Sequence, residues 1–376
     1  MSKGIDIYRT QTSTRAFGSP SRYYQGKGEI DNIGKYIADL GSNASIIIDG
    51  YLFDEMKLKI QAILPKELEV GFFSFGGECS DKEIDSFVKY ADEMNAEVII
   101  GLGGGKTLDV AKAASHKINA KLIICPSAAS TDAPTSALSV VYTEEGVHSH
   151  CYYFKTNPDI VLVDSNIIKN APVRLLVSGM GDAIATYFET MSNEHSDSAN
   201  YIGSGYRRTR LSLAVAELCY NIITEKGIHA KIEAENHICT DILEDVIEAN
   251  ILLSGLGFEN AGCSIAHAIA SGLSVLRDGD GYLHGEKVAY GVLVQHVLEG
   301  YSEEKLIKLI EFYLEIGLPT TLSDMNIVAN LENVEAIAKK SIVDFGPISK
   351  FVTIDYLCAC ILSADKFAEK MKDAYR

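Results

Sequence analysis

A glycine-rich segment that follows an apolar run restricts how this chain can fold. The run 98–100 ends in a cluster of glycines, after which Lys106 begins a helical pattern. The glycines are Gly101, Gly103, Gly104 and Gly105. A strand that turns through glycines into a helix exposes backbone N–H groups and the positive end of the helix dipole. The segment therefore predicts a phosphate cradle. The alternative is a turn that only joins strand to helix, although four glycines lose more chain entropy than such a turn requires.

Two nucleotide-binding motifs come close to this segment without matching it. A P-loop requires a glycine five residues before Gly105, and Ile100 occupies that position. The dinucleotide fingerprint requires a third glycine where this chain has Lys106. The failed P-loop spacing disfavours phosphoryl transfer from ATP, so the segment predicts a nucleotide without specifying which one.

Composition limits the class of protein. The chain has 376 residues, enough for two domains, and its 47% hydrophobic and 23% charged content is typical of a globular enzyme. A net charge of −17 disfavours nucleic acid and anionic membrane surfaces as partners. No apolar run approaches the ~20 residues of a membrane span, and residues 1–13 lack the apolar core of a signal peptide. Eight scattered cysteines without a C-x-x-C pair favour a reducing, cytoplasmic location.

The order of predicted elements indicates two domains. Up to about residue 171, short apolar strands alternate with helical segments, which is typical of a parallel α/β sheet. The predicted strands are 45–49, 69–74, 98–100, 121–125 and 160–163, with a hairpin formed by 137–142 and 147–154. After Pro172 only helical periodicity remains. We therefore expect an α/β dinucleotide-binding domain at 1–171, an all-helical domain at 172–376, and a site between them.

Three residues of the helical half could bind a metal. Asp182 lies among small residues, His267 lies on an apolar helix, and His284 precedes the next helix. The two histidines are too far apart for one helical face, but a turn at 277–281 would bring them together. One carboxylate, two imidazoles and an open position describe a catalytic zinc or iron site. The alternatives are a hydrogen-bonded core role for His267 and helix N-caps for Asp182 and His284.

Two further carboxylates follow predicted strands. Asp49 ends the first strand, where a carboxylate can bind a ribose diol and would repel a 2′-phosphate, so it favours NAD over NADP. Asp132 lies in the hydroxyl-rich stretch 126–138, after the fourth strand. Loops at the carboxyl ends of parallel strands are where α/β proteins bind ligands. The alternative for this stretch is a solvated loop.

Taken together, these segments resemble the glycerol dehydrogenases of the metal-dependent (iron-containing) alcohol dehydrogenase superfamily. The resemblance runs nearly end to end. Its motifs are GGGKTLDVAKA from Gly103, STDAPTSALSVVYTEEG from Ser130, SGMGDAIATYFE from Ser178, EANILLSGLGFENAG from Glu248 and HGEKVAYGVLVQ from His284. The chain departs from the family pattern at three places. Ser127 stands where many members have threonine, Cys263 and Ser264 stand where small apolar residues are expected, and residues 193–208 are more polar and basic than expected.

The resemblance implies a site residue by residue. Asp182, His267 and His284 would bind the metal, which is zinc in most of this branch, with iron as the alternative. Asp132 would contact the substrate hydroxyls, and Asp49 would bind the adenosine ribose. The remaining NAD-binding residues would be Gly104, Gly105, Lys106, Thr107, Asp109, Ser127, Ser130, Ser136, Leu138 and Tyr142. Family members commonly form octamers, so a homo-oligomer is expected.

The hypothesis is an NAD- and metal-dependent enzyme that oxidises glycerol to dihydroxyacetone. The nearest alternative is the same chemistry on 1,2-propanediol or a related 2-hydroxy compound. More distant alternatives are glycerol-1-phosphate dehydrogenase and a lyase of the dehydroquinate synthase type. That lyase would require more basic residues near the proposed ligands than this chain has. A non-catalytic nucleotide-binding module would be expected to lack a metal ligand, and all three are present.

Overall fold

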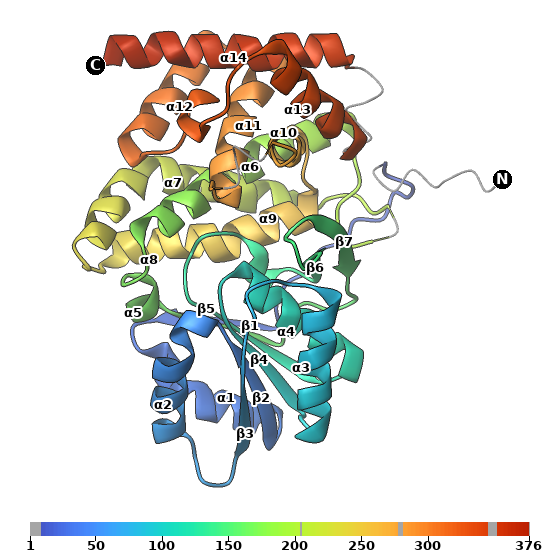
Figure 1. Cartoon of the computed structure of the whole chain (residues 1–376), viewed down its shortest axis with the longest axis vertical. Helices are drawn as coiled ribbons and strands as arrows, with labels where there is room; N and C mark the ends of the chain where they lie inside the picture. Colours follow the sequence, from blue (N-terminus) through green and yellow to red (C-terminus); the bar gives the residue numbers. More distant parts are fainter. Residues whose placement is uncertain (1–8, 204, 277–280, 345–351, 376) are drawn as a thin grey trace, which may run out of the picture. The chain divides into compact units, whose positions relative to one another are not determined.

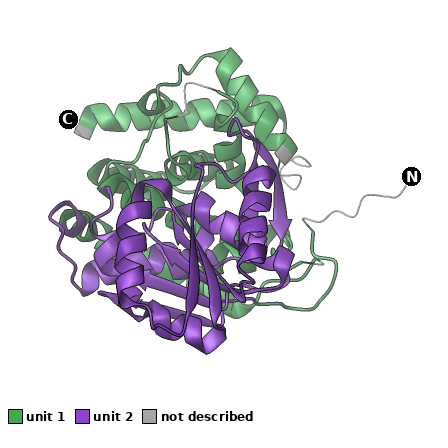
Figure 2. Ribbon diagram, turned by 60° about the horizontal axis from the view of Figure 1, so that its bottom comes forward, with its two compact units in different colours: residues 1–17, 173–232, 256–376 green, residues 18–172, 233–255 purple. Residues whose placement is uncertain are grey.

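The structure is a computed structural model that describes residues 9–203, 205–276, 281–344 and 352–375. The chain forms two compact units (Figure 2). We call residues 18–172 with 233–255 the sheet unit, and residues 1–17, 173–232 and 256–376 the helical unit. The chain thus passes from one unit to the other near residues 17, 172, 232 and 255. Of these four positions, only the one near residue 172 coincides with the predicted change from alternating strands and helices to helices alone.

The sheet unit contains a six-stranded parallel sheet with the order β1-β8-β5-β4-β2-β3 (Figure 1). Its strands are β1 Arg22–Gly26, β2 Asn43–Ile48, β3 Glu69–Ser74, β4 Val98–Gly103, β5 Lys121–Pro126 and β8 Ile160–Asp164. All of β4 is buried, as expected for a central parallel strand covered on both faces. The predicted strands and the parallel α/β class are confirmed. Strand β1 was not anticipated, because its sequence RYYQG has no apolar run.

Helices cover both faces of this sheet. The helices of the sheet unit are α1 Ile33–Leu40, α2 Phe53–Ile63, α3 Asp81–Glu93, α4 Gly105–Ile118, α5 Ser165–Ile168 and α8 Asp241–Glu248. Helices α1 and α2 share an apolar cluster with alternate residues of β2, β4, β5 and β8. Helix α4 packs on the opposite face, where Gly101 of β4 approaches Ala111 closely. The antiparallel hairpin of β6 Leu138–Tyr142 and β7 His148–Tyr153 agrees with the sequence prediction.

The helical unit has only helices as regular elements among its described residues. They are α6 Val173–Ser196, most of α7 Arg210–Glu235, most of α9 Ser254–Ala261, α10 Ile265–Leu273, α11 His284–Leu298, α12 Glu303–Ile316, α13 Leu331–Asp344 and α14 Ile354–Tyr375. The predicted change to an all-helical pattern after residue 172 is therefore confirmed for the described residues. None of the described helices has both the length and the apolar character required to cross a membrane.

Candidate active site

Close backbone packing brings three helices of the helical unit together. A Cβ atom on Gly181 of α6 would lie 2.5 Å from the carbonyl oxygen of Gly285 in α11. A Cβ atom on Gly291, further along α11, would lie 2.3 Å from the carbonyl oxygen of Ala266 in α10. Only glycine permits backbones to approach this closely. Because each contact adjoins a predicted metal ligand, the glycines determine where those ligands lie.

The predicted metal ligands Asp182, His267 and His284 meet at this point. The Asp182 Oδ1 atom lies 3.4 Å from His267 Nε2 and 3.5 Å from His284 Nε2. The ligand atoms of all three residues lie within 4.8 Å of one another. The Asp182 side chain is fully buried, whereas the His284 side chain is 48% exposed. The Asp182 cluster, as we call these three residues, is therefore closed on the aspartate side and open at His284.

The N-cap alternatives for Asp182 and His284 are wrong. Asp182 lies in the interior of α6, and the N-cap of α11 is Leu283 rather than His284. His267 is hydrogen-bonded, but its partner is a carboxylate that orients the ring toward the cluster. The turn predicted at 277–281 falls mostly on residues 277–280, which lie outside the described residues.

Glu189 is a residue of the candidate site that the sequence analysis missed. Its Oε2 atom lies 2.7 Å from His267 Nδ1, and its Oε1 atom accepts a hydrogen bond of 2.9 Å from the His267 main-chain N–H. This pairing places the proton on Nδ1 and directs Nε2 toward Asp182, as carboxylates do for metal-binding histidines. Glu189 follows Asp182 by two helical turns and therefore shares its face of α6. That spacing was the signal that could have identified it.

The electrostatic environment of the cluster favours the ionised form of Asp182 and the protonated form of His267. Burial opposes ionisation of Asp182, but the charge of His284 and the hydrogen bonds from both histidines outweigh it and hold the pKa of the carboxyl well below its usual range. Burial also opposes a charge on His267, yet the nearby Cys263 and Glu189 raise the pKa of the imidazole well above its usual value. A buried carboxylate faced by two imidazoles attracts positive charge, and a divalent cation can replace the protons that supply it.

The donor set fits a divalent metal. One carboxylate oxygen and two imidazole nitrogens are the ligands of catalytic zinc sites and of non-haem iron sites. A second group, Glu189 with Cys263 and His267, also has metal-ligand chemistry. In that group His267 would bind through Nδ1, which already pairs with Glu189. The Asp182 cluster, toward which His267 Nε2 is free to point, is therefore the better candidate.

The glycine loop of the sheet unit lies between β4 and α4. A Cβ atom on Gly103 would lie 2.8 Å from Thr107 Oγ1 and 3.0 Å from Asp49 Cβ, so this position has no room for a side chain. At Gly105, the first residue of α4, a Cβ atom would make only an ordinary contact, 3.5 Å from Thr131 Oγ1. Gly105 therefore leaves backbone accessible at a helix N-terminus, where N–H groups favour a phosphate.

Asp49 lies beside this loop. It follows β2, and its Oδ2 atom accepts a hydrogen bond of 3.4 Å from the Gly104 N–H. In the sheet, β2 and β4 are neighbours, and the strands that follow them in sequence, β3 and β5, lie on opposite sides of this pair. The strand order therefore reverses between β2 and β4, which is the topological switch point of the sheet. Open α/β sheets bind ligands outside the strand ends at such a point. The structure thus brings Asp49 together with Gly104 and Gly105.

Three other predicted cofactor residues surround a buried lysine. The Lys112 side chain is 1% exposed and lies 3.1 Å from the Asp109 carboxylate. Its ammonium also donates to Ser136 Oγ at 3.2 Å and to the Leu138 carbonyl at 3.0 Å. Asp109 Oδ2 accepts a further bond from the Val140 N–H. The structure therefore gives Asp109, Ser136 and Leu138 a part in holding the loop that precedes β6, which the sequence analysis did not foresee.

The remaining predicted cofactor residues lie near the loop. Lys106 pairs with Glu78 at 2.6 Å, and its ammonium lies 5.0 Å from the centre of the Tyr142 ring. Thr107 is fully buried beneath Gly103. The Ser127 N–H donates to the Gly103 carbonyl at 2.9 Å. Ser130 is partly exposed in the loop after β5.

Asp132 is held by a segment far along the chain. Its side chain is buried, and its Oδ2 atom accepts a hydrogen bond of 3.0 Å from Ser254 Oγ. Ser254 follows a π-helical turn, Ala249–Leu253, in which the Asn250 side chain donates to the Ala129 carbonyl at 2.9 Å. Residues 233–255 thus pack on the hydroxyl-rich loop within the sheet unit. The structure supports a positioned carboxylate here, and its contact with substrate stays a prediction.

Comparison with known proteins identifies the family of this chain. The sequence profile of iron-containing alcohol dehydrogenase matches residues 20–165. A glycerol dehydrogenase of Escherichia coli is 38% identical over 361 residues, which cover 95% of this chain and 98% of that protein. The chain therefore belongs to the iron-containing alcohol dehydrogenase family, and the resemblance noted from its motifs is confirmed.

Two further similarities concern substrate and fold. A glycolaldehyde reductase of Halobacterium salinarum is 36% identical, with 96% of this chain and 100% of that protein covered. The crystal structure of glycerol dehydrogenase from Schizosaccharomyces pombe is 33% identical and matches with a TM-score of 0.92, covering 98% of this chain and 94% of that chain. The similar proteins therefore share the fold over nearly its full length while differing in the substrate that their names give.

Proposed function

We propose that this protein is a metal-dependent, NAD-dependent dehydrogenase that oxidises glycerol at its secondary hydroxyl to dihydroxyacetone. The observation that carries the proposal is the convergence of Asp182, His267 and His284 in a chain whose similar proteins include several named glycerol dehydrogenases. A divalent metal in this cluster, zinc or alternatively iron, would supply Lewis-acid polarisation of the substrate hydroxyl.

The residues in and beside the Asp182 cluster would have different roles in catalysis. Asp182 supplies a buried negative charge, and Glu189 fixes the ring of His267 so that Nε2 faces the cluster. His284 forms the exposed edge, through which a small alcohol can enter. Preorganised groups of this kind cost no rearrangement during the reaction.

The sheet unit would bind the cofactor. The main-chain N–H groups at Gly104 and Gly105 would face the pyrophosphate, and Asp49 would accept hydrogen bonds from the ribose hydroxyls. A carboxylate at this position repels a 2′-phosphate, which favours NAD over NADP. NAD would supply the hydride acceptor. Lys106, Thr107, Ser127, Ser130 and Tyr142 are proposed to line the same site.

Asp132 is proposed to select a diol by accepting a hydrogen bond from the neighbouring hydroxyl. The main competing function is reduction of glycolaldehyde, favoured by the similarity to the Halobacterium reductase. We would measure kcat/KM for glycerol, 1,2-propanediol and 2-propanol with NAD, and for glycolaldehyde with NADH. The proposal predicts the largest value for glycerol. A larger value for glycolaldehyde would favour the competing function.

Two variants then separate recognition by Asp132 from its role in folding. Asp132→Asn removes the charge, whereas Ser254→Ala removes the hydrogen bond that holds the carboxylate. We expect Asp132→Asn to reduce the preference for glycerol over 2-propanol roughly tenfold to a hundredfold, and Ser254→Ala to retain most of it. Equal effects of the two variants would assign Asp132 a structural role.

We also propose a cytoplasmic homo-oligomer, with an octamer as the specific expectation. All eight cysteines are free thiols, as expected in a reducing compartment. Light scattering after gel filtration checks the oligomeric state, and a monomeric mass would refute this part of the proposal.

A further inference from the structure

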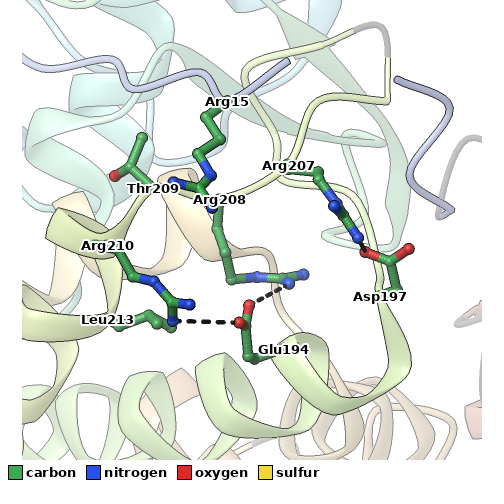
Figure 3. Close-up of a pocket in the computed structure, with 8 residues that line it drawn as sticks. All are labelled: Arg15, Glu194, Asp197, Arg207, Arg208, Thr209, Arg210 and Leu213. Atoms are coloured by element: carbon green, nitrogen blue, oxygen red, sulfur yellow. Dashed lines mark hydrogen bonds and ion pairs between the residues drawn. The ribbon is translucent and has the colours of Figure 1, made fainter. Parts of the chain in front are cut away.

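The basic stretch that departs from the family pattern lines a cavity in the helical unit. The cavity has a volume of about 300 Å³. Its walls are Arg15, Glu194, Asp197, Arg207, Arg208, Thr209, Arg210 and Leu213 (Figure 3). These residues come from the N-terminal segment, the end of α6, the loop that follows it and the beginning of α7. Residues from separate parts of the chain therefore form one polar cavity.

The charges in this cavity do not balance. Its four arginines face two carboxylates, which leaves a net charge of +2 in a chain whose overall charge is −17. Glu194 pairs with both Arg208 at 2.9 Å and Arg210 at 3.6 Å, and Asp197 pairs with Arg207 at 2.9 Å. Among the residues that the structure describes, Arg15 has no carboxylate partner. The cavity thus has more positive charge than its own acids can neutralise.

Arg208 is the most unusual of these residues. Its side chain is only 3% exposed. One terminal nitrogen donates to Glu194 and the other to the Ser198 carbonyl, but the buried Nε atom has no hydrogen-bond partner. A buried guanidinium with an unused donor is costly unless another acceptor completes it. An anion in the cavity, which Arg208 lines, would offset the charge of this guanidinium.

The surroundings keep these groups in place. Arg15 and Arg207 form a parallel bridge, in which the Ala16 N–H donates to the Arg207 carbonyl at 3.1 Å. The Thr209 and Ser212 side chains each accept a hydrogen bond from the other's main-chain N–H at the beginning of α7. The positive end of that 26-residue helix adds to the field of the arginines. The backbone that carries these residues is therefore fixed by hydrogen bonds, while the Arg207 and Arg210 side chains remain 46% and 74% exposed to a ligand.

We propose that this cavity binds the phosphate group of a small phosphomonoester. A phosphate ester carries about −1.5 to −2 charges at neutral pH, which matches the net charge of the walls. Arginine guanidiniums bind phosphate oxygens through paired, charge-assisted hydrogen bonds. The volume lies at the lower end of the range for small-molecule sites, so it accommodates a phosphate with a short organic part. This site is separate from the Asp182 cluster and does not depend on the proposed dehydrogenase activity.

The experiment is isothermal titration calorimetry of the full-length protein with glucose 6-phosphate and, separately, inorganic phosphate, at constant ionic strength. Arg15→Ala removes the arginine without a carboxylate partner, and Arg210→Ala removes one that is largely exposed. Arg22→Ala, on β1 of the sheet unit, is the control with the same loss of charge. We expect saturable binding of the sugar phosphate that Arg15→Ala and Arg210→Ala each weaken by about tenfold or more, and that Arg22→Ala leaves unchanged.

Several results would overturn the proposal. These are no saturable binding, binding that survives both Arg15→Ala and Arg210→Ala, and binding of inorganic phosphate without the sugar phosphate. Binding that survives both substitutions belongs elsewhere, for example at the glycine loop. Arg208 is not used as a test because its bond to the Ser198 carbonyl makes a folding defect the expected result of its removal. Thermal unfolding without ligand verifies that the Arg15 and Arg210 variants fold as the wild type does.

Discussion

The glycine loop and the Asp182 cluster are built in opposite ways. The loop consists of residues that are neighbours in the sequence. Because they are glycines, their main-chain N–H groups are accessible to a ligand. The cluster consists of side chains from three helices, and its ligand atoms meet only because those helices pack closely at glycines. The loop should therefore be damaged by adding atoms, whereas the cluster should be damaged by removing or neutralising them. The variants below test this contrast, beginning with the largest expected effect on turnover.

The largest effect is expected from Asp182→Asn. This substitution keeps the size of a fully buried side chain while removing the negative charge that two imidazoles face. Bound metal should be lost, and kcat with glycerol should fall roughly a thousandfold or more. Metal content by mass spectrometry and steady-state kinetics measure the two quantities.

Thr190→Val is the matched control for Asp182→Asn. Thr190 is also fully buried on α6, and its hydroxyl has no hydrogen-bond partner among the described residues, so valine replaces it with little change in shape. Its kcat and metal content should stay at the wild-type level. An active, metal-loaded Asp182→Asn protein would remove Asp182 from the ligand set.

The loop is tested by adding one methyl group at each of two glycines. Gly103→Ala should destabilise the fold by about 1–3 kcal/mol, because its Cβ would meet Thr107 and Asp49. Gly105→Ala should leave the free energy of unfolding unchanged but raise KM for NAD roughly tenfold to a hundredfold, because its methyl group enters the cradle. Urea unfolding and kinetics measure the two effects. Gly26→Ala, with no atom within 4 Å of the new Cβ, is the control. Unchanged KM in Gly105→Ala would place the pyrophosphate elsewhere.

Glu189→Gln separates positioning from ligation within the cluster. Glutamine can still accept one hydrogen bond, but it no longer pairs a charge with the His267 ring. We expect metal affinity to fall about tenfold to a hundredfold, and kcat to recover when metal is added in excess. Asp182→Asn should not recover under the same conditions. Competition with a chromophoric chelator measures the affinity, and recovery in both variants or in neither would contradict this distinction.

The smallest effect on turnover is expected from His296, which lies on α11 as His284 does but is 1% exposed. Burial lowers the pKa of His296 to about 4, despite its hydrogen bond to the Val292 carbonyl. Because the folded-state pKa lies below the unfolded value of about 6.5, the folded protein loses stability as the pH falls from 6.5 toward 4. Between pH 7 and pH 5 the loss from this group should be about 2 kcal/mol.

Urea unfolding of His296→Leu measures that contribution. The variant should lose less stability than the wild type between pH 7 and pH 5, with kcat at pH 7 unchanged. His229→Leu removes an exposed histidine of α7 and is the control for loss of an imidazole from the surface. Identical pH dependence in His296→Leu and wild type would contradict burial of a neutral His296.

The contrast between the two regions also explains what the sequence could predict. The loop is contiguous, so its glycines and the strand and helix around it were readable from local pattern alone. Asp182, His267 and His284 were visible as unusual residues, but their meeting depends on contacts such as Gly181 with Gly285 that no periodicity specifies. The motifs, rather than spacing, joined them into a site.

Other features depend on tertiary packing and were missed. Glu189 looked like an ordinary charged position until its contact with His267 was known. Lys112 is one of several lysines in the sequence, and only burial reveals that it holds the loop before β6. Residues 233–255 have helical periodicity like the rest of the second half, but periodicity does not say which unit a helix packs against.

The most direct test of the account is the reduction of NAD by glycerol before and after the metal is removed. The protein is treated with a chelator, shown to be metal-free by mass spectrometry, and assayed alone and with added zinc or iron. We predict that the metal-free protein does not reduce NAD and that one of the two metals restores turnover in wild type but not in Asp182→Asn. Undiminished turnover by verified metal-free protein would contradict the central claim.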